Sequence, residues 1–512
     1  QEILRGCGGW PPLTGHTKMT DTDTFPHPVY KDTVLAPLFE GVKTHYAAHM
    51  MAINKAHLVM LHDENILETH DAKQIAHSLI RIETETDPDK LTYTGEYEDY
   101  FFFVEAELKR HLGDLGGALH TARSRNDMDH TLFKLALQSR TESLISQLHA
   151  LGVAMLDKAQ VEKTTLITAW THGQPAQPTT FGHYLAAALE VLLRDITRLE
   201  AAAEGLDHCP MGAAAITTSG FPINRARMAE LLGFSEPLLN SYGCIASVDY
   251  VTGLYSAIKL TFLHLGRLIQ DMQFWSAFEV GQLHVPGALV QISSIMPQKR
   301  NPVPIEHMRH LASMTCGRSE AVISTMHNTP FTDMNDSEGE VQQGGYAAFD
   351  SAMRCASLLS AFIPAVTING DRVRANMNAA CVTITELADT LVRDEALTFR
   401  EAHEIAATVA KDVIAMGQGL EAGYDAFTTA FCKQTGRETA LGQQAFLDAV
   451  SPEGFVARRD RPGGPALPAL DGAFEIYNRQ QAALQLTQNA RLTRRSRSAA
   501  ALNAAFNTLT EV

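Results

Sequence analysis

YLAAALEVLLRDITRLEAAAEGL, residues 184–206, is the stretch that decides the fold. Its apolar side chains recur in steps of three and four residues, at Leu185, Leu189, Leu192, Ile196 and Leu199. Residues 251–271 carry a second stripe with the same spacing, at Leu254, Ile258, Phe262, Leu265 and Ile269. This is the period of an α-helix, and each of the two segments is long enough for about six turns. Alternating β-branched runs are few, so we expect an all-α fold of long, mutually packed helices in which any strands are short.

Five polar stretches interrupt the helical pattern. They are rich in Gly, Pro, Ser, Thr and Asn, and they comprise residues 113–126, 171–180, 212–222, 285–304 and 327–340. This composition predicts loops and helix ends. Because loops on a rigid scaffold often carry binding and catalytic residues, we expect the functional side chains there.

Composition and charge restrict the class of function. The 512-residue chain is 45% hydrophobic and 20% charged, which is ordinary for a globular protein, and it is too long for a single core. Its formal net charge of −16 disfavours binding to nucleic acid or to an anionic membrane surface, since both need a basic surface. An anionic small molecule is still a suitable ligand, because a pocket can be locally cationic.

The seven cysteines are scattered, odd in number and without a CxxC pair: Cys7, Cys209, Cys244, Cys316, Cys355, Cys381 and Cys432. This pattern predicts reduced thiols in a cytoplasmic protein, with neither a disulfide framework nor a metal cluster. The sequence shows no run of about 18 apolar residues, so no membrane span is expected, and no secretory signal. Because Met19 precedes a polar stretch, we interpret residues 1–18 as a leader or an added extension.

Three of the polar stretches contain dense motifs. Residues 293–302 read SSIMPQKRNP, which by composition alone also fits a solvated turn. Residues 119–127 read LHTARSRND, which also fits a helix start capped by Ser124 or Asn126. Residues 171–184 read THGQPAQPTTFGHY, in which His172 taken alone would be an ordinary polar loop residue.

In their order along the chain and at their spacing, the three segments resemble the motifs HTGRSRND, THxQxAQPxTxGHY and SSxMPxKxNP of the argininosuccinate lyase and fumarase (aspartase) superfamily. The resemblance implies a three-domain all-α fold whose long central helices form the core of a homotetramer, with active sites shared by three subunits. The implied domains are an N-terminal helical domain, a central bundle and a C-terminal helical domain, at residues 19–124, 125–376 and 377–512.

The reaction implied by the resemblance is that of a carbon–nitrogen lyase that releases fumarate from an N-substituted aspartate, without a cofactor or a metal. A proton leaves the carbon next to a carboxylate, and the C–N bond to the neighbouring carbon breaks. Lys299 and Asn301 are expected to stabilise the extra negative charge that the carbanion places on that carboxylate. Ser293 is the expected base, which requires cations and backbone N–H groups around its oxygen.

Further roles follow from the same resemblance. His172 is expected to pair with Glu306 and either to donate a proton to the leaving nitrogen or to orient the substrate. Glu306 also fits an ordinary surface residue near a helix start, where the helix dipole favours an acid. The residues expected to bind the substrate, a dicarboxylate or aminopolycarboxylate, are Ser124, Arg125, Asn126, Thr171, Gln174, Ser294, Met296 and Asn301.

The chain departs from argininosuccinate lyases at residues 330–336, which read PFTDMND where that family typically has AYNKDLQ. In the family this segment helps to hold the arginine end of the substrate. Here Phe331 lacks the tyrosine hydroxyl, and Asp333 and Asp336 replace a lysine and a glutamine. Such changes in an amine pocket should shift specificity, and acids here would attract a diamine nitrogen.

We therefore expect ethylenediamine-N,N′-disuccinate (EDDS), a bis-aspartate of a diamine, to be converted reversibly to N-(2-aminoethyl)aspartate and fumarate. Argininosuccinate is the alternative substrate, whereas adenylosuccinate and carboxymuconate fit the HTARSRND segment less well. A non-catalytic, crystallin-like structural role is a hypothesis of another class, and it is opposed by the intact set of Ser293, Lys299, Asn301 and His172.

Overall fold

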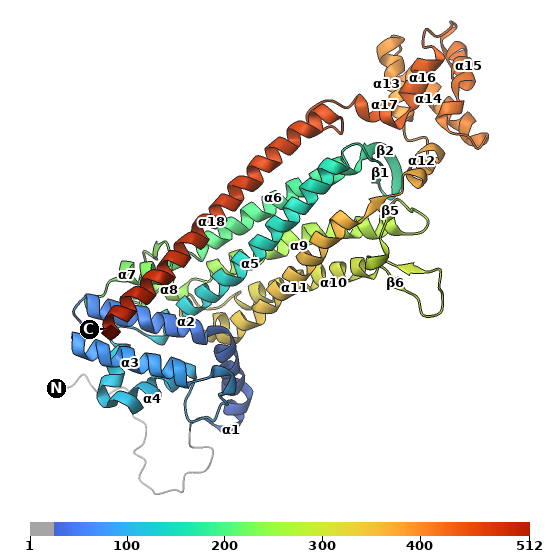
Figure 1. Ribbon diagram of the computed structural model, residues 1–512. Helices are drawn as coiled ribbons and strands as arrows, with labels where there is room; N and C mark the ends of the chain where they lie inside the picture. The colour runs from blue at the N-terminus through green and yellow to red at the C-terminus, as the bar shows by residue number, and fades with distance from the viewer. Residues whose placement is uncertain (1–24, 512) are drawn as a thin grey trace, which may run out of the picture.

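The computed structural model describes residues 25–511, which form an elongated helical molecule (Figure 1). The expected leader, residues 1–18, lies outside the described residues. A helical lobe at one end consists of α1 (Pro28–Tyr30), the π-helix η1 (Lys31–Leu35), α2 (Ala36–Asp63), α3 (Thr69–Glu85), η2 (Pro88–Lys90), α4 (Tyr100–Leu112) and η3 (Gly113–His120).

Long helices form the central bundle: α5 (Arg125–Val161), α6 (Phe181–Gly205), α9 (Asp249–Ser276), α10 (Val303–Thr325) and α11 (Gly339–Ala365), with the shorter α7 (Arg225–Leu232) and α8 (Ser241–Ala246) between α6 and α9 in the sequence. The two predicted stripes face the core, where the fully buried side chains include Leu185, Leu189, Leu199, Leu254, Ile258 and Phe262. None of the helices within residues 25–511 combines the length and the apolar character that crossing a bilayer requires.

The strands are short and form pairs. They are β1 (Leu166–Thr171) with β2 (Gln174–Thr180), β3 (His208–Cys209) with β4 (Glu236–Pro237), β5 (Leu283–His284) with β8 (Thr367–Ile368), and β6 (Gln291–Ile292) with β7 (Arg300–Asn301). The predicted all-α fold is thus confirmed, but the stretch 171–180, which we expected to be a loop, is mostly a strand. An irregularity in the register between Ala169 and Trp170 accommodates the proline-containing β2, since proline cannot donate to a regular ladder.

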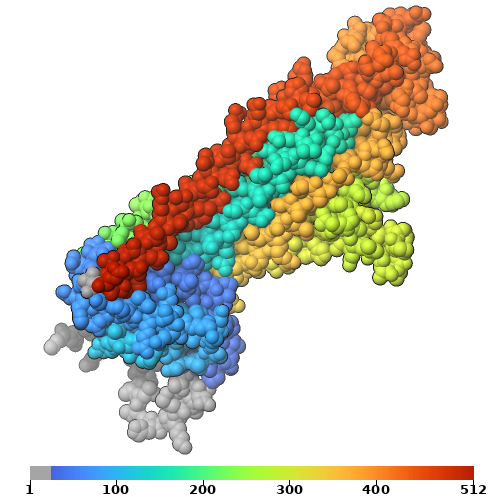
Figure 2. All heavy atoms as spheres, viewed as in Figure 1, coloured from blue at the N-terminus to red at the C-terminus, as the bar shows by residue number. Residues whose placement is uncertain are grey.

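The C-terminal region contains α12 (Gly370–Ala379), α13 (Ile384–Asp394), α14 (Phe399–Ala415), η6 (Leu420–Ala422), α15 (Tyr424–Thr435), α16 (Gln443–Val450), α17 (Pro452–Ala457) and α18 (Leu467–Glu511). We expected residues 377–512 to form one domain, but their packing divides them. Buried residues between Cys381 and Val450 form a core of their own. In contrast, α18 runs back along the bundle (Figure 2), and its apolar side chains join the main core, among them Leu470, Phe474, Leu502 and Phe506.

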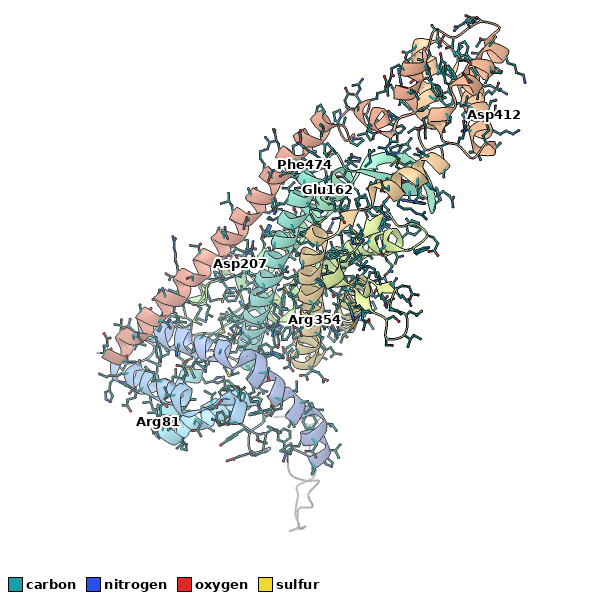
Figure 3. All side chains as sticks on the ribbon, turned by 45° about the vertical axis from the view of Figure 1, so that its right-hand side comes forward. Arg81, Glu162, Asp207, Arg354, Asp412 and Phe474 are labelled. Carbon is teal, nitrogen blue, oxygen red and sulfur yellow. The ribbon has the colours of Figure 1, made fainter. Side chains whose placement is uncertain are left out.

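Buried ion pairs hold α18 against the bundle. The guanidinium of Arg491, which is 5% exposed, binds Glu142 of α5 and Glu200 of α6. Arg494 and Arg495 bind Asp207, which Figure 3 labels on the bundle beside α18. Because leaving one of these charges unpaired would be costly, the pairs fix α18 along α6 and along α5, whose start carries candidate site residues.

Candidate active site

The SSIMPQKRNP motif forms the tip of a hairpin at one end of the bundle. β6 and β7 pair antiparallel, with Gln291 opposite Asn301 and Ile292 opposite Arg300. The guanidinium of Arg300 also donates to a backbone carbonyl at residue 285, at 2.8 Å. Both ends of the loop are therefore anchored, and its tip extends from the body of this chain (Figure 1).

The hydroxyl oxygen of Ser293 is a hydrogen-bond acceptor within this loop. It accepts from the backbone N–H of Met296 at 3.1 Å and of Ile295 at 3.4 Å. Two N–H dipoles aimed at one oxygen would stabilise an oxyanion there. Ser293 is half-buried, whereas Ser294 and Lys299 are exposed. One short segment thus presents a polarised serine oxygen together with a solvent-accessible cation.

His172 lies at the turn of the β1–β2 hairpin. Thr171 pairs with Gln174, so His172 and Gly173 are the two central residues of the turn. Both have positive φ, 54° and 73°, as in the type I′ turns that suit the twist of a hairpin. All four residues are exposed. The turn therefore holds the imidazole on the outside of this chain.

The second half of the same motif has a structural role. Thr180 caps α6 by accepting from the N–H of His183 at 3.1 Å. The ring Nε2 of His183 lies 3.0 Å from the carbonyl of Gly463, and the Tyr184 hydroxyl donates to Asp271 at 2.7 Å. These contacts join the start of α6 to α9 and to the chain that leads into α18, so only residues 171–174 are candidates for chemistry.

Glu306 lies in the first turn of α10, directly after the Ser293 loop, and is exposed. Its place fits the expectation that a helix dipole favours an acid there. Within residues 25–511 the structure shows no hydrogen bond or ion pair between Glu306 and His172.

The start of α5 carries the LHTARSRND motif. The Ser124 hydroxyl accepts from the N–H of Asn126 at 3.4 Å, and the carboxylate of Asp127 accepts from the N–H of Ser124 at 2.9 Å, which completes a capping box. The buried Asp127 also accepts from the N–H groups of Gly212 and Ala214, both at 2.9 Å. Ser124 is therefore a helix cap, and Asp127 fixes a second polar loop against the helix start.

Arg125 and Asn126 are half-buried and are oriented by their own chain. The guanidinium of Arg125 pairs with Glu98 at 3.1 Å and Asp99 at 2.8 Å, and it lies over the ring of Phe102. The amide of Asn126 donates to a backbone carbonyl at residue 215, at 3.1 Å. Both ion pairs of Arg125 use Nη1, so a ligand carboxylate would bind its other N–H groups.

The candidate residues lie at opposite ends of the bundle. α5 has 37 residues, so at 1.5 Å each it spans about 55 Å. Residues 124–126 stand at its start, whereas the β1–β2 hairpin follows its end (Figure 1). α10, with 23 residues and about 35 Å, likewise separates the Ser293 loop from the polar loop at 327–340. No small dicarboxylate reaches both ends within one chain.

Comparisons with known proteins identify the family. Residues 38–317 match the family described as Lyase, and residues 381–457 match the one described as Argininosuccinate lyase C-terminal. The chain is 56% identical to argininosuccinate lyase 2 of Agrobacterium fabrum over 495 residues, which cover 96% of this chain and 98% of that protein. It belongs to the argininosuccinate lyase and fumarase superfamily.

Other relatives support this family assignment. Argininosuccinate lyase 1 of Shouchella clausii is 32% identical over 85% of this chain and 88% of its own length. EDDS lyase in complex with formate superposes with a TM-score of 0.83 at 26% identity, covering 93% of this chain and 96% of that one. The class II fumarase of Schistosoma mansoni, at 14% identity and a TM-score of 0.64 over 82% of this chain and 91% of that one, shares the fold. The protein is thus a carbon–nitrogen lyase.

The structure adds three residues of this lyase that the sequence did not single out. Asp129 and His130, in the first turns of α5, and Glu338, at the start of α11, surround Asp333. The imidazole Nε2 of His130 lies 3.9 Å from Asp333 Oδ1 and 3.8 Å from Glu338 Oε1. In the sequence, the neighbouring acids of the segment 330–338 were the available signal of this cluster. Which of them come close to His130 is decided by the packing of α11 against α5.

Burial and crowding shift the pKa values in this cluster. Burial, followed by the nearby Asp99, raises the pKa of Asp129 to about 8. Burial and the neighbouring carboxyl of Asp333 raise the pKa of Glu338 to about 9. The contact with His130 lowers the pKa of Asp333. At neutral pH this part of the lyase therefore retains carboxyl protons.

We expect Asp129→Asn to stabilise the lyase at pH 8 by on the order of 1–3 kcal/mol, with a smaller gain at pH 5. The unfolded carboxyl ionises near its ordinary value of 3.8, whereas the folded one keeps its proton up to about pH 8. The folded state binds the extra proton between these values, so the wild type loses stability as pH rises through them. Urea unfolding at pH 5, 6.5 and 8 measures this slope. Asp114→Asn, at an exposed position of η3, is the control. Equal pH slopes of the unfolding free energy for the wild type and Asp129→Asn would contradict the expectation.

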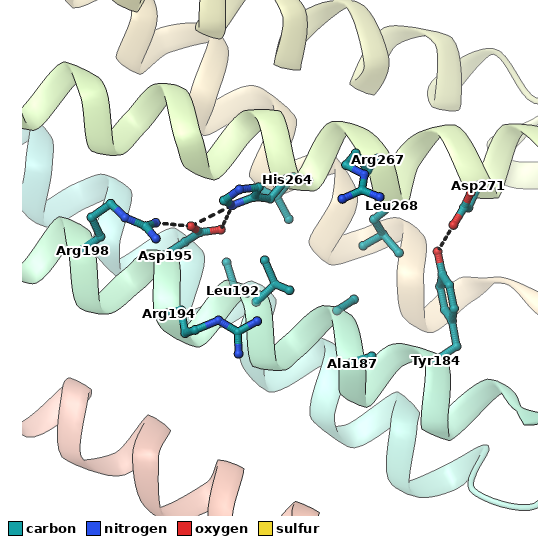
Figure 4. Close-up of a pocket in the computed structure, with 13 residues that line it drawn as sticks. Tyr184, Ala187, Leu192, Arg194, Asp195, Arg198, His264, Arg267, Leu268 and Asp271 are labelled. Atoms are coloured by element: carbon teal, nitrogen blue, oxygen red, sulfur yellow. Dashed lines mark hydrogen bonds and ion pairs between the residues drawn. The ribbon is translucent and has the colours of Figure 1, made fainter. Parts of the chain in front are cut away.

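A separate cavity of about 540 Å³ lies between α6 and α9 (Figure 4). In it Asp195 binds both Arg198 and His264, and Tyr184 donates to Asp271. None of the candidate catalytic residues lines the cavity.

Proposed function

We propose that this lyase eliminates fumarate from an N-substituted aspartate, with Ser293 as the base. The observation that carries the proposal is the Ser293 oxygen, which accepts two backbone N–H groups in the loop that also bears Lys299. As an oxyanion, Ser293 takes the proton from the carbon beside one carboxylate. Lys299 and Asn301 stabilise the negative charge that this carboxylate then gains.

The second half of the reaction breaks the C–N bond. The electron pair of the carbanion forms the double bond of fumarate, and the electron pair of the C–N bond leaves with the amine, which takes up a proton. His172, held outward on its turn and paired with Glu306 across a subunit boundary, supplies that proton or orients the nitrogen. Arg125, Asn126 and Thr171 bind the substrate carboxylates.

The active site is shared between subunits of a homotetramer in this proposal. Its support is the separation of the motifs, since α5 alone places residues 124–126 about 55 Å from the β1–β2 hairpin. Exposed apolar side chains on the middle helices give independent support, with Leu263 of α9 at 47% and Met314 of α10 at 41% exposure. An antiparallel packing of bundles would cover this face and bring opposite ends together.

The Ser293 loop closes over the substrate in this proposal and excludes water from the carbanion. Two apolar side chains support closure, because Ile292 is 76% exposed and Ile295 82% exposed in the single chain. Ser294 and Met296, on the same loop, would then contact the substrate. Gln174 faces it from the β1–β2 hairpin.

The identity of the amine half of the substrate is a second, more specific part of the proposal. Phe331 is 67% exposed and stacks on Tyr242, with the ring centroids 5.9 Å apart. Asp336 is exposed on the same loop. An apolar ring and an acid on the same loop suit a flexible diamine, so we propose EDDS as the first candidate substrate. The 56% identity with an argininosuccinate lyase favours argininosuccinate as the second candidate.

A substrate panel tests this function. EDDS, argininosuccinate and adenylosuccinate are each supplied to the full-length enzyme, and release is followed at the fumarate absorption band; the reverse direction uses fumarate with ethylenediamine, arginine, ammonia or AMP. We expect kcat/KM for EDDS to exceed that for argininosuccinate by at least about tenfold. Phe331→Tyr restores the tyrosine hydroxyl and should lower the ratio of kcat/KM for EDDS to kcat/KM for argininosuccinate.

The panel separates the two levels of the proposal. A preference for argininosuccinate would reject EDDS and leave the elimination chemistry intact. Absence of fumarate from every N-substituted aspartate would reject the chemistry itself.

We also propose a cytoplasmic location. All six cysteines among the described residues are free, and four of them are buried at about 4% exposure or less. Reduced, inert thiols are typical of a reducing compartment.

A further inference from the structure

His130 has a buried ring nitrogen that lacks a partner. The side chain is 1% exposed, and its Nδ1 lies 3.4 Å from the hydroxyl of Tyr250. Nε2 has no hydrogen-bond partner among the described residues, and it is directed at Asp333 and Glu338. Asp333 Oδ1, at 3.9 Å, is also buried without a hydrogen-bond partner. Unsatisfied buried polar atoms of this kind are costly and call for an explanation.

The charge around this imidazole is unbalanced. Asp129 approaches from α5 and Asp99 from the start of α4, so that four carboxyls including Asp333 and Glu338 surround the site. Arg125 faces them, but its guanidinium is already paired with Asp99 and with Glu98.

The spacing of the donor atoms distinguishes a metal ion from an ammonium group. The three candidate ligand atoms all lie within 4.8 Å of one another, and the imidazole is 3.8 and 3.9 Å from the two carboxylates. Two ligands of a tetrahedral ion with bonds of about 2.1 Å are about 3.4 Å apart. Two acceptors of one ammonium, with hydrogen bonds of about 2.8 Å, are about 4.6 Å apart. The observed separations are nearer to the metal value.

We propose that His130, Asp333 and Glu338 bind one divalent transition-metal ion such as Zn²⁺. An imidazole with two carboxylates is a suitable donor set for such an ion, and solvent completes the coordination. The contact between Nδ1 and Tyr250 orients the ring, as outer partners of metal-bound histidines do. The cysteine pattern led us to expect no metal cluster, and this site contains no cysteine.

The bound ion ties the loop before α11 to the start of α5. Asp333 and Glu338 belong to the loop, whereas His130 lies one turn beyond Asn126 on the helix. The ion therefore positions the loop that carries Phe331 beside the helix end that carries Arg125. The ion is assigned no step in the elimination, but the site shares Asp333 with the acids expected to attract a diamine nitrogen, so the ion and such an amine would compete for this carboxylate.

Metal binding by the intact protein tests this site. Full-length enzyme is treated with a chelator, dialysed and titrated with Zn²⁺ by calorimetry, and with Co²⁺ by visible absorption. We expect about one ion per chain, a rise in Tm with Zn²⁺, and a Co²⁺ spectrum of mixed nitrogen and oxygen ligation. Asp333→Asn combined with Glu338→Gln should lose the ion and the Tm rise. Glu236→Gln, which disrupts the exposed pair of His208 and Glu236, is the matched control and should keep both.

Three results would overturn the proposal. The first is no ion bound by the wild type, which requires no variant to fold. The second is equal Zn²⁺ binding by the wild type and the folded double variant. The third is a Tm rise with ethylenediamine, lost in the double variant, in the absence of any response to Zn²⁺, which would make the cluster an amine site.

Discussion

Ser293→Ala is expected to lower kcat by about a thousandfold while KM changes by less than about threefold, because loss of a general base removes an interaction made in the transition state. The Ser293 oxygen is held by the N–H groups of Ile295 and Met296, so its removal leaves the loop anchored by the β6–β7 pair. Initial rates of fumarate release, with the best substrate of the panel, measure the effect.

The control for this substitution is Ser451→Ala. Ser451 Oγ likewise accepts a backbone N–H three residues on, from Gly454 at 2.9 Å, but in the C-terminal lobe. Ser451→Ala should leave kcat unchanged. That result would show that losing a hydrogen bond between a serine hydroxyl and a nearby backbone N–H does not by itself lower turnover. Turnover of Ser293→Ala within about tenfold of the wild type would show that another group takes the proton.

Mixing two inactive variants is expected to restore activity. Ser293→Ala and Asn126→Ala alter opposite ends of the bundle, and in the proposed tetramer each site takes these residues from different chains. In randomly mixed tetramers about one quarter of the sites draw both residues intact, so activity should recover to about a quarter of the wild type. Equal amounts of the two variants are refolded together, and the rate of fumarate release is measured. We expect the rate of the mixture to exceed that of either variant alone by over about a hundredfold.

The matched control uses two changes on one loop. Ser293→Ala mixed with Lys299→Ala should not recover, because both residues come from the same chain at every site. Equal recovery in both mixtures would contradict a shared site, as would no recovery in the first mixture once native gels show hybrid tetramers. An active monomer would also exclude the shared arrangement.

The long helices and the motif segments were predictable because both are local in the sequence, although residues 174–180, expected to be a loop, form β2. Spacing of apolar residues is enough to place the stripes of α6 and α9 in the core. Local sequence did not reveal the backbone geometry of the motifs. His172 and Ala122 both have positive φ, 54° and 64°, although neither is the glycine that normally signals this conformation. Ala122 occupies the place where the resembling motif has glycine.

The return of α18 along the bundle was not predictable from its composition. Its polar residues include Arg491, which would suggest a solvent-exposed helix until Glu142 and Glu200 are known to face it. The expectation of one C-terminal domain failed to describe this packing, because a chain segment joins whichever core its apolar stripe can bury against.

By itself, the sequence determined the class of chemistry and the all-helical fold, since a motif of adjacent residues and a periodic apolar stripe are both properties of short segments. Only the tertiary structure decided which polar groups meet: it set the Ser293 loop and the Ser124 cap at opposite ends of rigid helices, and it brought His130 to Asp333 and Glu338. The physical reason is that electrostatic and coordination chemistry act over a few ångströms in space, whereas the segments that supply these groups are joined by helices several times that length.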